Sequence, residues 1–242
     1  MPGLIEAATA ILSASERRLE TVSNNVANVS TPGFKRQLSF SQAGPSASPF
    51  GVAGRPAGPV PALATRPDLA QGKMSATKNP LDLAISGTGF FQLRAGNEVV
   101  YSRQGQFRLA EDGTVVTPQG HVLQQAGGGD LVLERAGVTI LEDGQVLDGE
   151  RPVGRIALFA PASPDTAVQS LGGSLFAFAG EAVEADASGL RQGMVEASNV
   201  SMGDEMVSMM AAVRQAEGGA RLVQLYDDLM GRAITAFGQS SQ

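Results

Sequence analysis

Apolar residues repeat with a helical period only at the two ends of this 242-residue chain. Near the N-terminus, the residues Ile5, Leu12, Leu19 and Val26 repeat every seven, and a second set follows three residues later, beginning at Ala8. Near the C-terminus, steps of three and four, with Asp227 as the one polar break, join Met206, Met209, Val213, Ala216, Ala220, Val223, Met230 and Ile234. Heptads are typical of helices that pack along one seam. We therefore expect two long helices with these residues along the helix seam.

Local signals place the limits of both helices. The first should stop near Ser30, because Pro32 disfavours the helical region at the preceding residue. The pair Pro32-Gly33 suits the centre of a type II turn, in which glycine supplies the positive φ. The run Ser201-Met202-Gly203-Asp204 has the form of a capping box, so the second helix should start near Met202. Continued to residue 237, it would be about 50 Å long.

The middle of the chain has a different pattern. Residues 41–67 hold six of the 13 prolines, so we expect an extended arm with few ladder hydrogen bonds. From 78 to 187 short apolar runs alternate with turn signals. The runs include Leu81–Ile85, Gly89–Leu93, Gln106–Leu109 and Arg155–Phe159, and the turns Ala95–Asn97, Glu111–Gly113, Glu142–Gly144 and Asp148-Gly149. Asp-Gly between such runs predicts hairpins, and hence an antiparallel β domain.

Composition excludes several classes of site. The chain has no cysteine, which excludes disulfides, thiolate nucleophiles and zinc–thiolate sites. A single histidine gives no basis for a metal site, and we expect neither metal nor cofactor. A net charge of −6 opposes binding to nucleic acid. No apolar stretch is long enough for a transmembrane helix, and the N-terminus lacks the basic region of a cleavable signal peptide.

The sequence gives little evidence for catalytic residues. His121 lies beside a turn and is expected to be a surface strand residue. Asp112, Asp143 and Asp148 lie at turns, where aspartate favours local backbone hydrogen bonds. These scattered carboxylates are the whole basis for one hypothesis of function, a hydrolase that acts on cell-wall glycans. We expect no catalytic residues and no enzymatic activity.

Two features of the ends allow two interpretations each. The heptads could form a private helical hairpin, or pack between subunits. Small seam residues bury little area, and Gly218 and Gly219 each cost a helix about 1 kcal/mol relative to alanine, so we favour order that depends on assembly. In the segment Ser23–Ser30, Asn24 and Asn28 share one face. Their amides could cap a fraying last turn, or form a polar contact face against another subunit.

Four blocks of residues resemble one family. The segment Ser23–Lys35, with Asn24, Asn25, Asn28, Thr31, Gly33 and Phe34, resembles the N-terminal signature of the bacterial flagellar rod and hook proteins. Asn79–Phe91 resembles the start of that family's β domain, and Tyr101–Phe107 followed by Asp112-Gly113 resembles its next block. Gln192–Val200 and the helix beyond resemble the C-terminal block. The run from Glu142 to Ile156 looks most like the proximal-rod member.

The resemblance implies a structural protein without an active site. Family members stack into a hollow helical shaft that transmits torque across the periplasm, and they are exported unfolded without a cleavable signal peptide. The implied partners are copies of itself, other rod subunits, the flagellar export apparatus and the surrounding ring proteins, and the implied location is the periplasmic rod of the basal body. A distal-rod or hook-type axial subunit is the alternative. A further alternative, from another class of function, is a self-contained secreted β-domain binding protein.

The expected fold is α+β: a central antiparallel β domain flanked by N- and C-terminal heptad helices that form a coiled-coil-like domain. Residues 1–36 carry the first helix and signature turn, 37–75 the Pro/Gly-rich arm, 76–190 the β domain and 193–242 the last helix. The two terminal segments together are expected to make one discontinuous helical domain.

Overall fold

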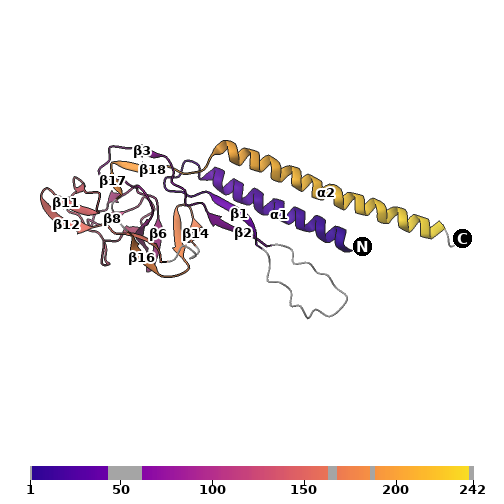
Figure 1. Ribbon diagram of the computed structural model, residues 1–242, viewed down its shortest axis with the longest axis horizontal. Coiled ribbons are helices and arrows are strands. Elements are labelled where there is room, and N and C mark those ends of the chain that lie inside the picture. Colours follow the sequence, from indigo (N-terminus) through magenta and orange to yellow (C-terminus); the bar gives the residue numbers. More distant parts are fainter. Residues whose placement is uncertain (1, 43–61, 163–167, 186–188, 240–242) are drawn as a thin grey trace. The chain divides into compact units, whose positions relative to one another are not determined.

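The computed structural model describes residues 2–42, 62–162, 168–185 and 189–239. It is an α+β protein with a β-rich core and a helix at each end, as the sequence predicts (Figure 1). The chain divides into two compact units. The helical unit contains residues 1–26, 37–65 and 201–242, and the β unit contains 27–36 and 66–200. Neither unit is continuous in sequence, so the chain passes between them at 26/27, 36/37, 65/66 and 200/201.

The two helices are α1, Pro2–Ala27, and α2, Met202–Gln239. The start predicted for the second helix, near Met202, is confirmed. The first helix ends three residues before Ser30, because the amide of Thr31 turns back to the carbonyl of Asn28 at 3.1 Å and begins a non-helical turn. Within the helical unit the two helices lie side by side and run in opposite directions (Figure 1).

Small and polar side chains form the buried stripe between the helices. Ala8, Ser15 and Val22 on α1 are buried and repeat every seven residues. On α2 the buried residues Glu205, Ala212 and Gly219 have the same spacing. A Cβ built on Gly219 would lie 3.1 Å from side-chain atoms of Ile11 and Leu12. The glycine that weakens α2 as an isolated helix is therefore a place where α1 approaches it closely.

The apolar residues predicted for the seam lie at the edges of this stripe or outside it. Leu12, Leu19, Val26, Met209 and Val223 are half-buried. Ile5, Met206, Val213, Ala220 and Met230 are exposed, and the side chain of Ile234 lies outside the described part of the structure. On α2 the apolar pattern runs one residue later than the buried stripe, because Glu205 and Gly219 occupy positions where a hydrophobic pattern expects large apolar residues.

The ends of the predicted proline-rich arm form a small sheet. Strands β1, Gln37–Gln42, and β2, Ala62–Pro67, pair with each other. Residues 62–67 therefore have ladder bonds where the proline content predicts few. The remainder of the arm, 43–61, lies outside the described residues.

The β unit contains the other strands, and every pairing between them is antiparallel. The first strands are β3 Met74–Ala76, β4 Leu83–Ile85, β5 Phe90–Ala95, β6 Glu98–Ser102, β7 Arg108–Leu109, β8 Val115–Val116, β9 Val122–Leu123 and β10 Thr139–Ile140. They are followed by β11 Gln145–Asp148, β12 Arg151–Arg155, β13 Leu158–Pro161, β14 Val168–Gly172, β15 Leu175–Phe178, β16 Ala182–Ala185, β17 Leu190–Gln192 and β18 Met194–Glu196.

The main sheet has the order β14-β15-β6-β5-β9-β8-β7, with β13 joining β5 to β16. A three-stranded sheet contains β10-β11-β12, and two pairs, β17-β4 and β18-β3, bring the end of the β unit against its beginning. The predicted turns join β5 to β6, β7 to β8, β10 to β11 and β11 to β12, so the hairpin predictions are confirmed. One predicted run, Arg155–Phe159, is divided between β12 and β13.

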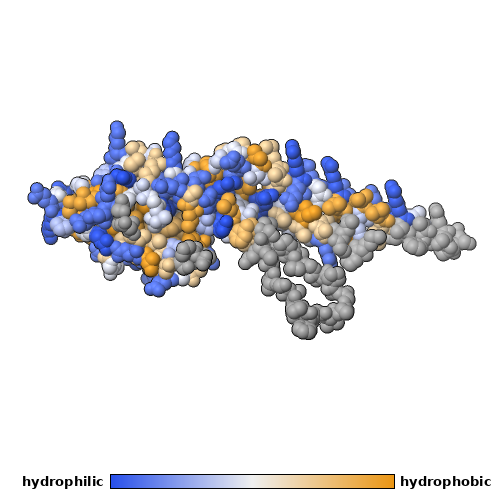
Figure 2. Space-filling view, viewed as in Figure 1, coloured by the Kyte–Doolittle hydropathy of each residue, from blue (hydrophilic) through white to orange (hydrophobic). Residues whose placement is uncertain are grey.

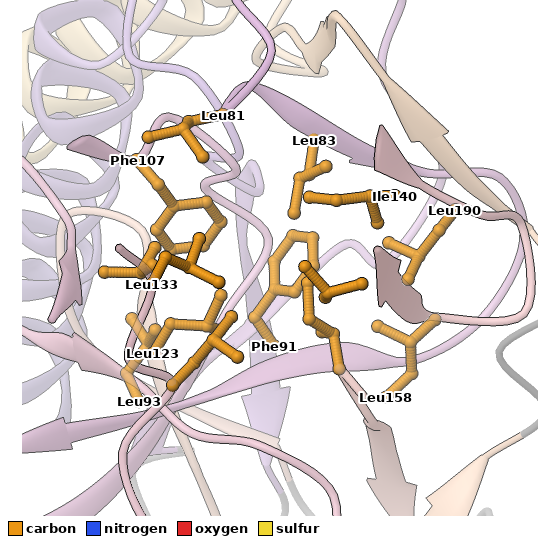
Figure 3. Close-up of a cluster of buried hydrophobic side chains, with 14 of the residues drawn as sticks. Leu81, Leu83, Phe91, Leu93, Phe107, Leu123, Leu133, Ile140, Leu158 and Leu190 are labelled. Atoms are coloured by element: carbon orange, nitrogen blue, oxygen red, sulfur yellow. The ribbon is translucent and has the colours of Figure 1, made fainter. Parts of the chain in front are cut away.

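The core of the β unit is aliphatic around a pair of phenylalanines (Figure 3). Phe91 lies in the middle of the cluster, and its ring meets that of Phe107 edge-on at 5.4 Å. Leu83, Ile140, Leu158 and Leu190 lie on one side of Phe91, and Leu93, Leu123 and Leu133 lie on the other. Leu190 comes from β17, so the core is complete only when the last strands of the unit are in place.

Gly105 permits a close approach that the core requires. A Cβ at this position would lie 1.6 Å from the carbonyl oxygen of Leu83, so Gly105→Ala must shift the backbone of β4. We expect this variant to lose about 1–3 kcal/mol in urea unfolding of the β unit. Gly137→Ala is the control, because nothing lies within 4 Å of a Cβ there. Equal stabilities for the two variants would contradict the packing described here.

Candidate functional site

The signature segment that follows α1 makes its tightest contact at Gly33. Its φ is +71°, the positive value expected of glycine in the predicted turn. A Cβ there would come within 2.2 Å of the amide nitrogen of Gln104. The amide of Gly33 donates to the backbone carbonyl of Glu196 at 2.8 Å. The turn is thus inserted between two parts of the β unit that lie far away in sequence.

Lys35 is buried two residues later. Its side chain is 1% exposed, and Nζ donates to Glu196 Oε1 at 2.6 Å and to the carbonyl of Ala70 at 2.8 Å. Phe34, also 1% exposed, anchors the same turn, and its amide donates to the carbonyl of Thr31. Lysine is almost never fully buried unless it is paired, so this contact with Glu196 is a strong constraint on the fold.

Glu196 is shared by three segments of the β unit. Oε1 accepts from Lys35 and from the amide of Gly72 at 2.7 Å, and Oε2 accepts from Arg103 Nη1 at 3.2 Å. Arg103 is 4% exposed, donates from Nη2 to the carbonyl of Gly87 at 2.7 Å, and lies over the ring of Phe90. We call Lys35, Arg103 and Glu196 the buried ion cluster.

The buried ion cluster holds two cations against one carboxylate. Burial lowers the pKa of the Lys35 amine, because desolvation disfavours the charged form, and Glu196 opposes this shift. Burial lowers the pKa of the Arg103 guanidinium in the same way, again opposed by Glu196. Within the described residues, Nε of Arg103 has no hydrogen-bond partner. Glu196 is therefore the carboxylate that contacts both buried cations.

Asn199 adds a second clamp beside the cluster. Its Oδ1 accepts from the amide of Arg36 at 2.7 Å, and its Nδ2 donates to the carbonyls of Asp68 and Ala70, both at 2.9 Å. The amide of Asp68 in turn donates to the carbonyl of Arg36 at 2.7 Å. We call residues 31–36, 66–72, 102–105 and 193–199 together the joint.

Strand pairing delivers the C-terminal part of the joint. β17 pairs with β4 in the register Leu190 with Ile85, and β18 pairs with β3 in the register Glu196 with Met74. Both pairings leave the side chain of Glu196 inside, where it is 1% exposed. These strand pairings place the carboxylate of Glu196 where Lys35 Nζ reaches it.

Asn25 has a comparable role within the helical unit. It is 1% exposed, accepts from the amide of Gln37 at 2.8 Å and donates to the carbonyl of Gln37 at 2.9 Å. Its Nδ2 also donates to Glu205 Oε2 at 3.2 Å, and Glu205 is buried on α2. The amide of Asn25 thus joins the end of α1, the start of β1 and the start of α2.

Two other signature residues, Asn24 and Asn28, lie at the end of α1 and just beyond it. Asn24 is exposed, and Asn28 is half-buried and accepts from the hydroxyl of Thr31 at 3.2 Å. The contact of Asn28 with Thr31 joins two side chains of the same turn, whereas Asn25 contacts Gln37 and Glu205.

Sequence reasoning did not single out Lys35, Arg103, Glu196, Asn199 or Glu205. The available signal was weak: a charged residue inside an otherwise uncharged block, as with Glu196 in Met194-Val195-Glu196-Ala197. Nothing in a single sequence shows that such residues meet.

No arrangement for catalysis is present in the described ranges. They contain no group of three or more His, Cys, Asp or Glu residues that could hold a metal ion. His121 is half-buried beside the turn at Thr117. Asp112 and Asp143 accept from backbone amides two residues on, as predicted, whereas Asp148 pairs with Arg135. The hydrogen bond from Thr114 lowers the pKa of Asp112. Neither described helix is long and apolar enough to cross a membrane.

Family comparisons match three parts of the chain. The family described as flagella basal body rod protein matches residues 5–35, the flagellar hook protein FlgE/F/G D1 domain matches 84–147, and the flagellar basal body rod FlgEFG protein C-terminal domain matches 191–236. Lys35, Arg103 and Glu196 each come from a different one of these segments. The buried ion cluster therefore links all three family-matched parts.

Curated relatives cover nearly the whole chain. The flagellar basal-body rod protein FlgF of Caulobacter vibrioides is 32% identical over 231 residues, which are 92% of this chain and 93% of the relative. The chain belongs to the flagellar basal-body rod protein family. FlgF of Mesorhizobium japonicum is 30% identical, covering 94% of this chain and 95% of that protein. FlgG of Caulobacter vibrioides is also 30% identical, covering 90% of this chain and 93% of that protein.

Membership in the rod protein family determines the kind of function. The chain is a structural subunit of the flagellar basal-body rod, assembling with copies of itself and other rod subunits, and the family is not one of enzymes. The glycan hydrolase hypothesis is thereby rejected.

Asn199 allows a direct test of the joint. Asn199→Ala removes three hydrogen bonds to the backbone of Arg36, Asp68 and Ala70, so we expect a loss of about 1–3 kcal/mol in urea unfolding of the β unit. Asn199→Asp should lose more at pH 7, since a carboxylate would face two carbonyl oxygens. Gln169→Ala, at an exposed position of β14, is the control. Wild-type stability for Asn199→Ala would refute the clamp.

Proposed function

We propose that this chain is a subunit of the proximal rod. The run from Glu142 to Ile156, which resembles the proximal-rod member, forms most of the small sheet β10-β11-β12. Two FlgF proteins are among the relatives that match nearly end to end. The described β unit contains one main sheet and no second large β domain of the kind expected of a hook protein. FlgG relatives match almost as well, so a distal-rod position is the alternative.

The observation that carries assembly is an exposed apolar face along α2. Met206, Val207, Met210 and Val213 are 42–63% exposed. Figure 2 shows hydrophobic surface along the helices. A helical tube requires contacts between different surfaces of successive subunits, and such a face is suited to one of them. Large exposed apolar patches on soluble proteins generally mark interaction sites.

The helix register adds a second unpaired surface. Gly219 lies against Ile11 and Leu12, and Glu205 lies against Asn25, so an antiparallel register places the first turn of α1 near residue 228 of α2. The last turns of α2, to Gln239, then extend about 15 Å past α1 at 1.5 Å per residue. Leu229 and Met230, 50% and 44% exposed, lie on this extension.

We infer that α1 and α2 form a coiled-coil-like pair that becomes fully ordered in the assembled rod. The buried stripe is made mainly of Ala8, Ser15, Ala212 and Gly219, which remove little apolar area from water. The predicted domains, with the terminal segments making one discontinuous helical domain, belong to the same proposal. So do export in an unfolded state without a cleavable signal peptide, by the flagellar export apparatus, and contact with the surrounding ring proteins.

The double variant Leu12→Asp/Leu19→Asp tests the role of the helices. Both leucines are half-buried on α1, so two carboxylates should abolish rod assembly and motility in complemented cells. In the purified full-length variant, the midpoint temperature at which the β unit unfolds should shift by less than about 2 °C, because α1 belongs to the other unit. Ser13→Asp/Glu20→Asp, at exposed positions of α1, is the matched control and should preserve motility.

A self-contained binding protein with a private helical hairpin gives the opposite result. In that case the leucine variants would lower the melting temperature of the monomer clearly, and the helices would be protected from protease in dilute solution. Either result would contradict the proposal that the helices become fully ordered only in the assembled rod. Labelling the subunit in imaged basal bodies separates the remaining alternatives, because a label next to the hook would refute the proximal position.

A further inference from the structure

Gly218 lies in the middle of α2, where a glycine weakens a helix. It is exposed, and nothing lies within 4 Å of a Cβ built there. The neighbouring Gly219, by contrast, packs against Ile11 and Leu12, so the approach of α1 accounts for that glycine. No contact among the described residues accounts for Gly218 in the same way. Its lack of a side chain is therefore available to a neighbour outside the subunit.

The residues that share one side of α2 with Gly218 form an exposed surface. We call Val207, Ala211, Gly218 and Leu225 the glycine face, because they lie on one side of a helix with about 3.6 residues per turn. The large side chains of Val207 and Leu225 are 63% and 52% exposed. Small residues in the middle let another helix approach closely, and the apolar residues at the ends then have area to bury against it.

Two arginines lie beside the glycine face. Arg214 and Arg221 are exposed on the side of α2 opposite the buried stripe. Glu217 lies one turn from both, but no ion pair of either arginine is present in the described parts of the chain. Both guanidinium groups are therefore available to carboxylates of another molecule.

The outer side of α1 is acidic. Glu6, Glu16 and Glu20 are exposed, and the helical period places all three opposite the buried stripe. Arg17 lies at the edge of this side, so the net charge of the side stays negative. None of the three carboxylates has an ion pair within the ranges that the structure describes. We call these three residues the acidic face, and its charge is complementary to that of the two arginines on α2.

We propose that the acidic face of α1 in one copy of this chain docks on the glycine face of α2 in a second copy. The proposal rests on the proposed function, in which copies of the chain assemble into the rod. The acidic face lies on the far side of α1 from α2, so the two faces cannot meet within one subunit. Their contact joins two different surfaces, and such contacts repeat without closing, as a helical tube requires. Pairing of the carboxylates with Arg214 and Arg221 fixes the orientation of the two copies.

Gly218→Leu in the full-length chain tests the close approach. In cells that lack the native subunit, we expect at least about tenfold less of this variant in isolated basal bodies, because leucine fills the space that the second helix requires. Leucine favours a helix more than glycine does, so the purified variant should show at least the wild-type helix content by circular dichroism.

Gly231→Leu is the matched control for this variant. Gly231 is also exposed on α2, with nothing within 4 Å of a Cβ, but it lies on another side of the helix. This control should enter basal bodies as the wild type does. Normal incorporation of Gly218→Leu would overturn the proposal, and so would an equal loss in both variants, because the effect would then not depend on the glycine face.

Exchange of charges between the two faces tests the choice of partner. Glu16→Arg/Glu20→Arg and Arg214→Glu/Arg221→Glu each place like charges opposite each other, so each alone should reduce incorporation at least about tenfold. When the two variants are produced in the same cells, each supplies the face that the other lacks. We then expect incorporation to recover to within about threefold of wild type. If the mixture stays out of basal bodies, the partner is not a second copy and the proposal is wrong.

Failure of this docking is distinguishable from failure of the proposed function. If Leu12→Asp/Leu19→Asp abolishes assembly while Gly218→Leu and both charge reversals incorporate normally, the docking proposal is wrong and the proposed function stands. Normal assembly of Leu12→Asp/Leu19→Asp would contradict the proposed role of the helices itself. The control Ser13→Asp/Glu20→Asp leaves the outer side of α1 acidic, so the docking proposal also expects it to preserve motility.

Discussion

A single buried carboxylate holds together the part of the β unit that carries the family's signature. Glu196 compensates two cations, Lys35 and Arg103, that would otherwise be expensive to bury, and it also accepts from the amide of Gly72. A hydrophobic contact tolerates small shifts, whereas a charge-assisted hydrogen bond is short and directional. The cluster therefore fixes the relative positions of segments far apart in sequence more closely than packing alone would. Such fixed geometry suits a subunit whose task is mechanical.

The helical unit is built on a different physical basis. Its buried stripe consists of small residues, and its apolar residues lie largely at the edges of the stripe or in solvent. Asn25, with its bonds to Gln37 and Glu205, gives this unit a buried polar anchor. Close approach at Gly219 brings the helices together without burying much surface. In the assembly that we propose, neighbouring subunits supply the free energy that such helices lack in isolation, since each exposed apolar side chain still has its area to bury.

Regular patterns made much of this fold predictable. The capping box placed the start of α2, and Asp-Gly turns located the hairpins, because both signals act over a few residues. The predicted inner face of α2 lies one residue after the buried stripe of the structure. Glu205 and Gly219 are not large apolar residues, so a search for a hydrophobic period does not include them. Lys35, Arg103 and Glu196 form a cluster only through tertiary contacts over long sequence separations. Their meeting depends on the register of β17 and β18, which no local pattern encodes.

The separation of buried charge from exposed apolar surface has a consequence for the assembly as a whole. A subunit that exists alone and then binds strongly in a polymer needs two things: a fixed internal geometry, and apolar surface that is left to bury against other subunits. The joint supplies the first, because its ion cluster is fully enclosed and offers nothing to a neighbour. In the assembly that we propose, the exposed face of Met206, Met210 and Val213 supplies the second, because these side chains still have apolar area to bury. Changes in one should therefore leave the other intact, which is what allows stability and polymerisation to be adjusted separately.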